Sequence, residues 1–381
     1  MEIAIIGCGI GGLAAGALLA QAGHDITIFD RFKQPEPIGS GLVVQPVGLA
    51  VLQSIGAAEY ALRKGQKIIH MQGQEIKSGY NVLDVSYGNR FGLAIHRTSL
   101  FAALYQSALS AGVKVITATE ITKTELQGDK RLVNGTGFNA VIDASGAGSV
   151  LSAMKRKPLQ FGALWATVNW PETSLPMDHL SQKYKSAKNM IGVLPVGSLP
   201  NETAAKATIF WSLPQSEFAA WRQQPLENWK AEAKNLWPEM APFLDQVTCH
   251  DDMTMAFYSH GTLKKPYEER LVHIGDSAHA ASPQLGQGAN MALLDAQALA
   301  LALAQYPLQT ALQKYAKSRL RHVRAYQLMS AAFTPMYQSD SRLLPFLRNW
   351  FFAPLTRIPP APWGLKKLVC GDIIKPIKGL K

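Results

Sequence analysis

The clearest pattern of hydrophobic and polar positions stands at the beginning of the chain. Residues 2–6 (EIAII) are almost all apolar, which predicts a short buried strand. Glycine-rich residues 7–12 follow, and LAAGALLAQAG then predicts a helix of small side chains that is closed by Gly23. Residues 25–30 (DITIFD) alternate between polar and apolar side chains, as a half-buried strand does. The pattern therefore predicts a strand, a helix and a second strand in one βαβ unit.

Elements of the same kind are expected further along the chain. Residues 91–121 predict a strand, an amphipathic helix and another strand, and residues 139–149 (NAVIDASGAGS) predict a buried strand that runs into a glycine turn. Residues 270–276 (RLVHIGD) predict a buried strand that ends at Asp276. The later stretch MALLDAQALALALAQ predicts a helix that is apolar on nearly every side. This alternation is typical of an α/β fold.

The composition limits the classes of protein that need to be considered. With 381 residues and 47% hydrophobic content, the chain can bury a large core and form more than one domain. The formal net charge of +11 would suit an anionic partner, but no Lys/Arg block is interleaved with aromatic residues, which argues against a nucleic-acid-binding protein. The chain contains no uninterrupted stretch of about 20 apolar residues, so we predict no transmembrane helix.

The cysteines and the first residues bear on location. Cys8, Cys249 and Cys370 are scattered, with neither the spacing of a metal site nor the even count of a disulfide framework. The first strand is not preceded by a basic region or a small-residue cleavage site. We therefore expect no bound metal and a cytoplasmic protein.

The glycines after the first strand have the spacing of a dinucleotide-binding turn. Gly7 permits the tight turn, Gly9 lets backbone approach a pyrophosphate, and Gly12 lets the helix pack on the strand. Asp30, at the end of the second strand, is placed to accept hydrogen bonds from a ribose. The strand before, the helix after and the acid together predict a dinucleotide site with a Rossmann-like fold.

A second glycine-rich segment, GDSAHAASPQLGQGAN (residues 275–290), precedes the apolar helix. Asp276 is expected at the carboxyl edge of a sheet, where α/β proteins bind ligands. Pro283 fixes the chain, and Gly286 and Gly288 leave room for a flat ligand against the backbone. The helix begins near Ala289 and points its N-terminal amides at the same place. Such a site suits a ring that takes on negative charge, as reduced flavin does.

At these two motifs the chain resembles a known family. It is similar to the FAD-dependent aromatic hydroxylases of the para-hydroxybenzoate hydroxylase type, the single-component flavoprotein monooxygenases. With GSGLVVQP (residues 39–46) and IHRTSL (residues 95–100), the resemblance covers about residues 1 to 330. The family's second fingerprint, GD followed by A-H, P and G-Q-G, is matched by Gly275, Asp276, Ala278, His279, Pro283, Gly286, Gln287, Gly288 and Asn290.

The resemblance implies a cofactor, a reaction and a set of site residues. The cofactor would be non-covalent FAD, reduced by NADH or NADPH, and dioxygen would form a flavin C4a-hydroperoxide that hydroxylates an aromatic, phenolic or quinone-like molecule. Asp30 would bind the adenosine ribose, Arg97 the pyrophosphate and ribityl region, and Asp276 the ribityl chain. The expected cofactor residues are Gly7, Gly9, Gly12, Asp30, Arg31, Gly41, Arg97, Asp276, Gly286, Gln287, Gly288, Ala289 and Asn290. The expected catalytic residues are Pro283, Gly286 and His279.

Other interpretations of these residues stay open. His279 could be a packed, hydrogen-bonded histidine, and Arg97 could bridge surface carboxylates. A dehydrogenase, a reductase or a halogenase would use the same cofactor, although the G-W-x-W-x-I-P stretch of halogenases is absent. A flavin-binding protein without turnover is a further alternative. The substrate, the regiochemistry, the choice between NADH and NADPH and the oligomeric state are not identified.

One motif departs from the family pattern. The family carries A-D-G-x-x-S, followed three residues later by Arg, and this motif is associated with FAD and NAD(P)H binding. Here Gly146 and Ser149 match, but Ser145 replaces the aspartate and Ser152 replaces the arginine. A serine hydroxyl cannot replace the charge and the donors of an arginine. We therefore expect bound FAD, with reduction by NAD(P)H that is slow, dependent on the substrate or replaced by an external electron donor.

The domains follow from these patterns. We expect an α/β protein: a Rossmann-like FAD-binding domain (residues 1–157, completed by 266–332), a β-sheet-rich substrate domain (158–265), and a C-terminal helical tail (333–381). Part of residues 65–95 is a candidate addition to the substrate domain. The tail, with LLPFLRNWFFAPL, is expected either to cover the substrate entrance or a membrane surface, or to pack against the FAD-binding domain.

Overall fold

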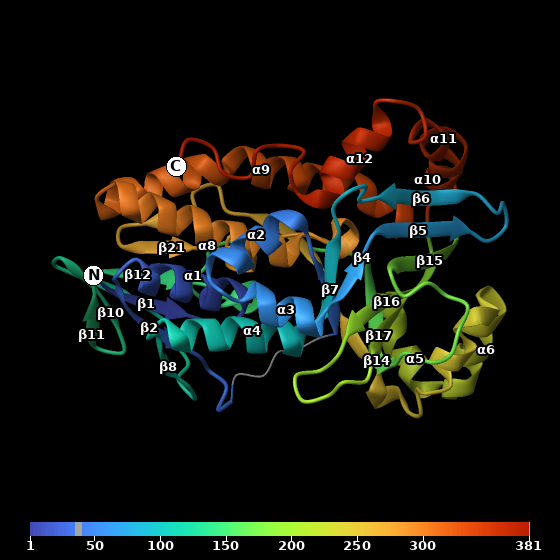
Figure 1. Cartoon of the computed structure of the whole chain (residues 1–381), viewed down its shortest axis with the longest axis horizontal. Helices are drawn as coiled ribbons and strands as arrows, with labels where there is room; N and C mark the ends of the chain where they lie inside the picture. Colours follow the sequence, from blue (N-terminus) through green and yellow to red (C-terminus); the bar gives the residue numbers. More distant parts are fainter. Residues whose placement is uncertain (35–39, 381) are drawn as a thin grey trace.

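The computed structural model describes residues 1–34 and 40–380. Gly39 of the GSGLVVQP motif lies outside the described residues. The chain forms two halves joined side by side, with the half that contains the N-terminal βαβ unit at the left of Figure 1 and a large, mostly antiparallel sheet at its right. The long helix α9 (Leu308–Tyr337) runs along the top and connects them (Figure 1).

The first half is built around a six-stranded sheet in the order β20-β21-β12-β1-β2-β8. All neighbouring strands are parallel except β20 and β21. This confirms the α/β prediction. The strands are β1 (Glu2–Ile6), β2 (Asp25–Phe29), β8 (Lys114–Ile116), β12 (Ala140–Asp143), β20 (Tyr267–Glu268) and β21 (Leu271–His273).

Helices α1 and α8 pack against each other beside this sheet. In α1 (Ile10–Gln21), buried Gly11 and Gly16 leave room for close neighbours, because Cβ atoms there would lie 3.4 Å from Ala292 and 3.1 Å from Ile28. The helix α8 (Gly288–Gln305) is buried over most of its length, as its uniformly apolar sequence predicts. The other helices of this half are α2 (Pro46–Ser54), α3 (Ala58–Lys64) and α4 (Arg97–Ser110).

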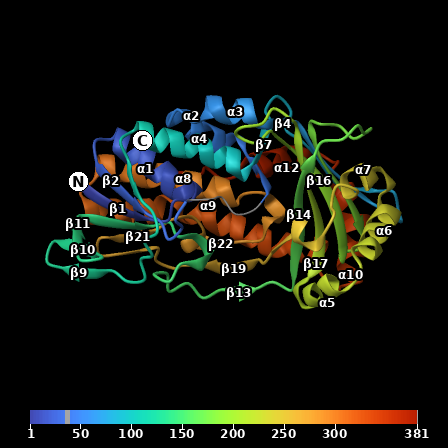
Figure 2. The same cartoon turned by 90° about the horizontal axis from the view of Figure 1, so that it is seen from below.

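The second half is a seven-stranded sheet in the order β18-β14-β17-β16-β15-β5-β6. Its strands are β5 (His70–Glu75), β6 (Asn81–Ser86), β14 (Phe161–Asn169), β15 (His179–Lys185), β16 (Asn189–Gly197), β17 (Lys206–Pro214) and β18 (Thr254–Ala256). Residues 70–86 therefore extend a sheet whose other strands come from residues 161–256. One face packs on Trp221, Trp229 and Trp237 from the helices α5 (Phe218–Gln223) and α6 (Leu226–Leu236) and the residue after α6, with α7 (Ala241–Leu244) beside them (Figure 2).

Three small sheets complete the described strands. The first joins β3 (Gly41–Val44), β7 (Gly92–His96) and β4 (Gln66–Ile68), and lies where the two halves meet. The second is a meander of β9 (Glu125–Gln127), β10 (Lys130–Val133) and β11 (Thr136–Phe138). The third contains β13 (Lys157–Pro158), β19 (Ser259–Thr262) and β22 (His279–Ala280).

The C-terminal tail differs from the expected boundary at residues 332 and 333. Helix α9 continues past this point to Tyr337, because the interior Pro335 does not end it. Beyond it lie α10 (Leu343–Leu347), a π-helical turn (Arg348–Phe352), α11 (Ala353–Leu355) and α12 (Ala361–Cys370). The tail is helical as expected, and it covers the β5–β6 edge of the seven-stranded sheet (Figure 1).

Candidate functional site

The turn between β1 and α1 requires two of its glycines for steric reasons. Gly7 has a φ of +104°, and a Cβ on it would lie 2.6 Å from the carbonyl oxygen of Ala144. A Cβ on Gly12 would lie 2.0 Å from the carbonyl oxygen of Gly7. Both distances are far below van der Waals contact, so the tight turn and the close packing of α1 exclude a side chain at these positions.

Gly9 differs from these two glycines, because no atom of the described residues lies within 4 Å of a Cβ placed on it. It precedes α1, and no side chain caps the first amides of that helix. Uncapped amides at a helix N-terminus carry a positive partial charge and attract phosphate. The open space in front of these amides therefore fits the pyrophosphate of a dinucleotide such as FAD.

Asp30 directly follows β2 and lies against this turn. One carboxylate oxygen accepts a hydrogen bond from the Cys8 amide (2.7 Å), and the other accepts one from the Phe32 amide (2.9 Å). These bonds fix the carboxylate beside the glycines, and each oxygen keeps a lone pair for a ribose hydroxyl. The neighbouring Arg31 is exposed, and its guanidinium lies 4.9 Å from the centre of the Phe32 ring. Its role towards the cofactor stays a prediction.

The second glycine-rich segment begins with a correction to the expected strand. Strand β21 ends at His273, not at Asp276, because Gly275 (φ +61°) turns the chain into a short 3-10 turn. Asp276 lies in that turn, with its side chain exposed. It is still beyond the carboxyl end of a parallel strand, which is the place where ligands bind in α/β sheets.

The segment then leads into the N-terminus of α8. Pro283 begins a 3-10 turn, Gly286 ends it with a φ of +60°, and α8 begins at Gly288. Within the described part of the chain, no atom lies within 4 Å of a Cβ on Gly288, and no side chain caps the helix. This open backbone, which includes Ala289, fits a flat ring against the first amides of α8, in keeping with the expected flavin position.

Two of the expected cofactor residues use their side chains within the protein. The Gln287 amide donates to the carbonyl oxygens of Leu368 (3.4 Å) and Val369 (2.8 Å) in α12. Asn290 is fully buried, accepts a hydrogen bond from the Gln45 amide (2.8 Å) and donates to the Val43 carbonyl (3.3 Å). These contacts hold the loop against the tail and against β3, so both side chains can shape the site without touching a ligand.

Gly41 and Arg97 lie where the two halves of the molecule meet. A Cβ on Gly41 would lie 2.2 Å from Val196, so the glycine allows β3 to approach β16 closely. Arg97 begins α4, and its backbone amide donates to the Ser40 carbonyl (3.2 Å). Burial raises the pKa of Tyr258 to about 12, while its bond to Trp165 and the charge of Arg97 act in the opposite direction. Arg97 thus lies near a partly buried tyrosine in the segment between β18 and β19.

His279 is buried and belongs to a charged cluster behind the loop. Its Nε2 lies 2.6 Å from a carboxylate oxygen of Asp295, and the other oxygen accepts a bond from Arg319 (2.7 Å). Burial alone would raise the pKa of Asp295, but the charges of His279 and Arg319 outweigh it and hold this pKa well below its usual range. The Gly275 amide also donates to Asp295 (2.9 Å). His279 is therefore a packed, hydrogen-bonded histidine, and its catalytic role stays a prediction.

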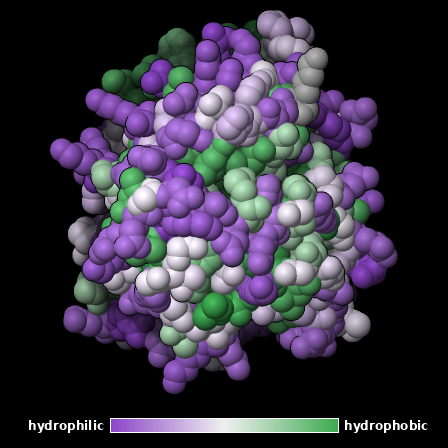
Figure 3. Space-filling view, turned by 90° about the vertical axis from the view of Figure 1, so that its left-hand side faces the viewer, coloured by the Kyte–Doolittle hydropathy of each residue, from purple (hydrophilic) through white to green (hydrophobic). Residues whose placement is uncertain are grey.

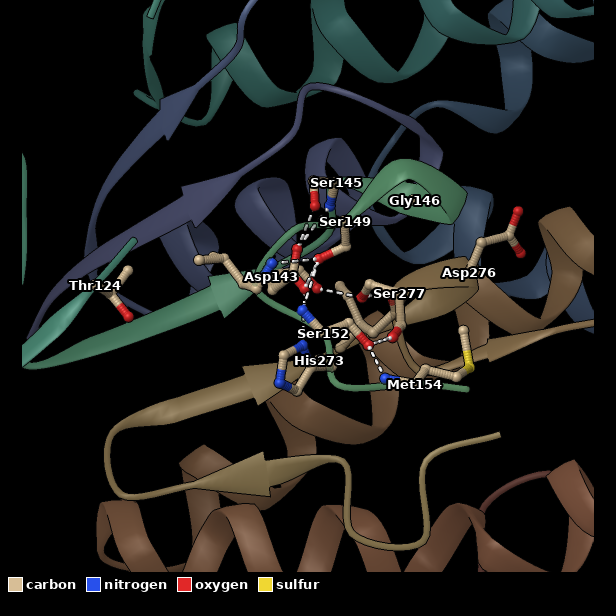
Figure 4. Close-up of polar contacts among 12 residues, drawn as sticks. Thr124, Asp143, Ser145, Gly146, Ser149, Ser152, Met154, His273, Asp276 and Ser277 are labelled. Carbon is tan, nitrogen blue, oxygen red and sulfur yellow. Dashed lines mark hydrogen bonds and ion pairs between the residues drawn. The ribbon is translucent and has the colours of Figure 1, made fainter. Parts of the chain in front are cut away.

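The residues that replace the family's middle motif form a hydrogen-bonded cluster around Asp143 (Figure 4). Its carboxylate accepts bonds from the hydroxyls of Ser145 (2.5 Å) and Ser149 (2.6 Å), and lies 2.7 Å from Nδ1 of His273. Burial would raise the pKa of Asp143, but these three contacts lower it below its ordinary value. The Ser152 hydroxyl donates to the Ser277 carbonyl (2.6 Å), which ties this cluster to the turn that carries Asp276.

Two residues that lie at the candidate site were missed from the sequence. Asp143 ends β12 at the same edge as Asp276, and its position after a buried strand could have identified it. Arg156 donates to the carbonyl oxygens of Asp276 (3.2 Å) and Gly146 (3.4 Å). Arg156, four residues after Ser152, thus contacts the middle motif at Gly146. Among the described residues, no three His, Cys, Asp or Glu side chains are grouped to hold a metal ion.

Comparisons with known proteins agree with this geometry. Residues 1–330 match the model of the FAD binding domain family. The putative 2-heptyl-3-hydroxy-4(1H)-quinolone synthase AqdB1 of Rhodococcus erythropolis is 27% identical over 344 residues, which cover 86% of each chain. The 3-hydroxybenzoate 6-hydroxylase of Klebsiella oxytoca is 24% identical over 346 residues, which cover 80% of each chain.

A solved structure shares the fold. The crystal structure of Klebsiella pneumoniae HpxO, complexed with FAD and uric acid, superposes with a TM-score of 0.79 at 19% identity, and the match covers 97% of each chain. The family model spans both glycine-rich motifs, and the described residues leave open backbone at each of them. The chain therefore belongs to the FAD binding domain family, as an FAD-dependent enzyme of the aromatic hydroxylase type.

Proposed function

We propose that this enzyme inserts one atom of dioxygen into a small, electron-rich ring, of the kind found in phenols, hydroxylated pyridines and quinolones. The observation that carries the proposal is the pair of open, uncapped helix N-termini at Gly9 and Gly288. Both lie within residues 1–330, which match the family model. The names of the relatives, a quinolone synthase and a hydroxybenzoate hydroxylase, support a ring substrate.

Residues at the N-termini of α1 and α8 would bind different parts of the cofactor. When FAD is bound, it supplies the electron transfer and the activation of oxygen. The amides that follow Gly9 would hold its pyrophosphate, and Asp30 would orient the adenosine ribose. The amides at Gly288 and Ala289 would stabilise negative charge on the ring system, because they lie at the positive end of α8. Arg156 would keep the Asp276 turn in place.

The seven-stranded sheet would exclude water from the reacting ring. Trp165 and Phe210 pack together on this sheet, with ring centres 4.9 Å apart. Trp165 donates to the hydroxyl of Tyr258 (2.9 Å), and Arg97 lies near this hydroxyl. The phenol is protonated at neutral pH, since its pKa lies at about 12, and it can donate a hydrogen bond to a ring substituent.

The test bypasses the electron donor. The FAD-loaded enzyme is reduced with dithionite, mixed with ¹⁸O₂ and a panel of phenols, hydroxypyridines and quinolones, and the products are analysed by mass spectrometry. We expect one labelled oxygen atom in the product from at least one class. Reoxidation without label in any product would favour a dehydrogenase or reductase, and failure to bind FAD would remove the proposal altogether.

We also propose that the C-terminal tail contacts a membrane surface. The sequence LLPFLRNWFFAPL supports this contact, because it combines aromatic and basic residues as interfacial segments do. No helix in the described part of the chain has both the length and the apolar character needed to span a bilayer. The contact would therefore be peripheral.

A further inference from the structure

The tail displays a group of large apolar side chains outward. Six of them, spread from α10 through the π-helical turn to the first turn of α12, are between 46% and 61% exposed. We call them the tail surface: Phe346, Trp350, Phe351, Phe352, Ile358 and Trp363. The opposite end of the molecule is mainly hydrophilic, with small apolar patches between polar side chains (Figure 3). Exposed aromatic groups are costly in water, so a gathering of this size marks an interaction site.

The display is enforced by a buried arginine on the inner side of the turn. Arg348 is 1% exposed and donates to the carbonyl oxygens of Met336 (3.0 Å) and Ser186 (3.1 Å). Its guanidinium lies 5.2 Å and 5.1 Å from the ring centres of Tyr184 and Tyr337. The inward position thus holds a hydrogen-bonded cation, which anchors the turn, and the aromatic residues that follow it are exposed.

The charges around the tail surface identify the partner. Residues 341–371 contain no Asp or Glu. Arg342 and Arg357 are exposed, and the Lys367 amine lies 4.2 Å from the centre of the Trp363 ring. A second copy that presented the same surface would bring these cations together, which disfavours a symmetric dimer. Aromatic side chains flanked by basic ones are complementary to the headgroups of an anionic bilayer.

We propose that the tail surface docks this protein on an anionic lipid bilayer, with Trp350, Phe351 and Phe352 inserted at the headgroup level. This inference deepens the membrane contact proposed above and does not depend on the hydroxylation. Arg342 and Arg357 would lie against lipid phosphates. Each inserted side chain should strengthen partitioning by at least about tenfold, which corresponds to about 1.4 kcal/mol and lies at the low end of what the transfer of a large apolar side chain out of water is worth.

Vesicle flotation of the FAD-loaded protein tests the inference. The vesicles contain phosphatidylcholine with or without phosphatidylglycerol. We expect the wild type to float with the anionic vesicles and to be released by high salt. The variant Trp350→Ser/Phe351→Ser/Phe352→Ser should lose at least a hundredfold in partitioning, and Arg342→Gln/Arg357→Gln should lose binding to the anionic vesicles selectively.

Two controls make the result decisive. The variant Phe257→Ser/Leu328→Ser removes apolar side chains that are 60% and 71% exposed elsewhere, and should float like the wild type. Arg321→Gln removes an exposed cation from α9 and should do the same. Equal flotation of the triple serine variant and the wild type would overturn the proposal. So would a wild type that stays unbound and forms a dimer in light scattering that the triple variant abolishes, because a second copy would then be the partner. Turnover of the unbound protein with ¹⁸O₂ reports the hydroxylation separately.

Discussion

The contrast between Gly9 and Gly12 leads to a prediction about two substitutions in one turn. The open space at Gly9, with a backbone φ of −90°, accepts a side chain in the absence of a cofactor. At Gly12 a Cβ would lie 2.0 Å from the Gly7 carbonyl oxygen. We therefore expect Gly9→Val to leave the fold intact and to weaken FAD binding, and Gly12→Ala to damage the fold itself.

The magnitudes follow from these contacts. A valine at Gly9 would keep the pyrophosphate away from the first amides of α1, and each charge-assisted hydrogen bond lost is worth about 1.5–3 kcal/mol. The loss of one or two such bonds raises the dissociation constant of FAD by about tenfold to about twenty-thousandfold. The free energy of unfolding of the apoprotein should change by less than about 1 kcal/mol, because the backbone conformation at Gly9 is open to other residues. Overpacking at Gly12 should cost the apoprotein about 1–3 kcal/mol or more.

Two measurements on the apoprotein separate these effects. Titration with FAD, followed by flavin fluorescence, gives the dissociation constant, and urea denaturation gives the free energy of unfolding. Gly364→Ala is the matched control, since its Cβ also meets no atom of the residues that the structure describes, and it lies in α12, far along the chain from the turn. If a well-folded Gly9→Val protein bound FAD as tightly as the wild type, the assignment of the pyrophosphate to this helix end would fail.

Other contacts of the site give three further expectations. Asp295→Asn leaves the buried Arg319 without its carboxylate partner, so the free energy of unfolding in urea should fall by about 3–5 kcal/mol. Asp25→Asn removes the exposed partner of Lys114 and should cost less than about 1 kcal/mol. Because the pKa of Asp295 is depressed in the folded state, the stability that this carboxylate contributes to the fold is complete above its ordinary pKa of 3.8 and is lost as the pH falls towards the folded pKa. A urea midpoint that does not change between about pH 5 and pH 2 would contradict this. Reduction by NADH or NADPH in anaerobic stopped flow should be slow without an aromatic ligand, and fast reduction would show that Ser145 and Ser152 are harmless.

The prediction on reduction is refined by the cluster around Asp143. Ser145 and Ser152 are hydrogen-bonded to Asp143 and to the Ser277 carbonyl, so neither replacement leaves a buried charge without a partner.

Arg156 brings a cation to the turn that carries Asp276, although its contacts are with two backbone carbonyls. Arg156→Gln should therefore lower the affinity for FAD if this cation supports the Asp276 turn, and FAD titration measures it. If the affinity for FAD were unchanged, Arg156 would have no part in binding the cofactor.

The sequence by itself determined the features that depend on neighbouring residues. The glycine spacing, the apolar strand β1 and the small-residue helix α1 define one turn, in which the contact of Gly12 with Gly7 is local, whereas that of Gly7 with Ala144 comes from the neighbouring strand. The α/β class, the family and the FAD cofactor followed from this turn and from the second glycine-rich segment, and all three are confirmed. Local rules failed at one strand end, where the left-handed backbone at Gly275 stops β21 before Asp276.

Only the tertiary structure decided which distant groups meet. Asp143 and His273 are 130 residues apart and pair because β12 and β21 are neighbours in the sheet. Gln287 and Asn290 match the family motif, yet their side chains bind the tail and β3, which no spacing in the motif encodes. The buried Arg348 and the outward aromatic turn beside it likewise depend on the packing of the tail against the sheet edge. The physical reason is that such contacts are set by strand order, register and close packing between elements, whereas a short stretch of sequence determines only its own conformation.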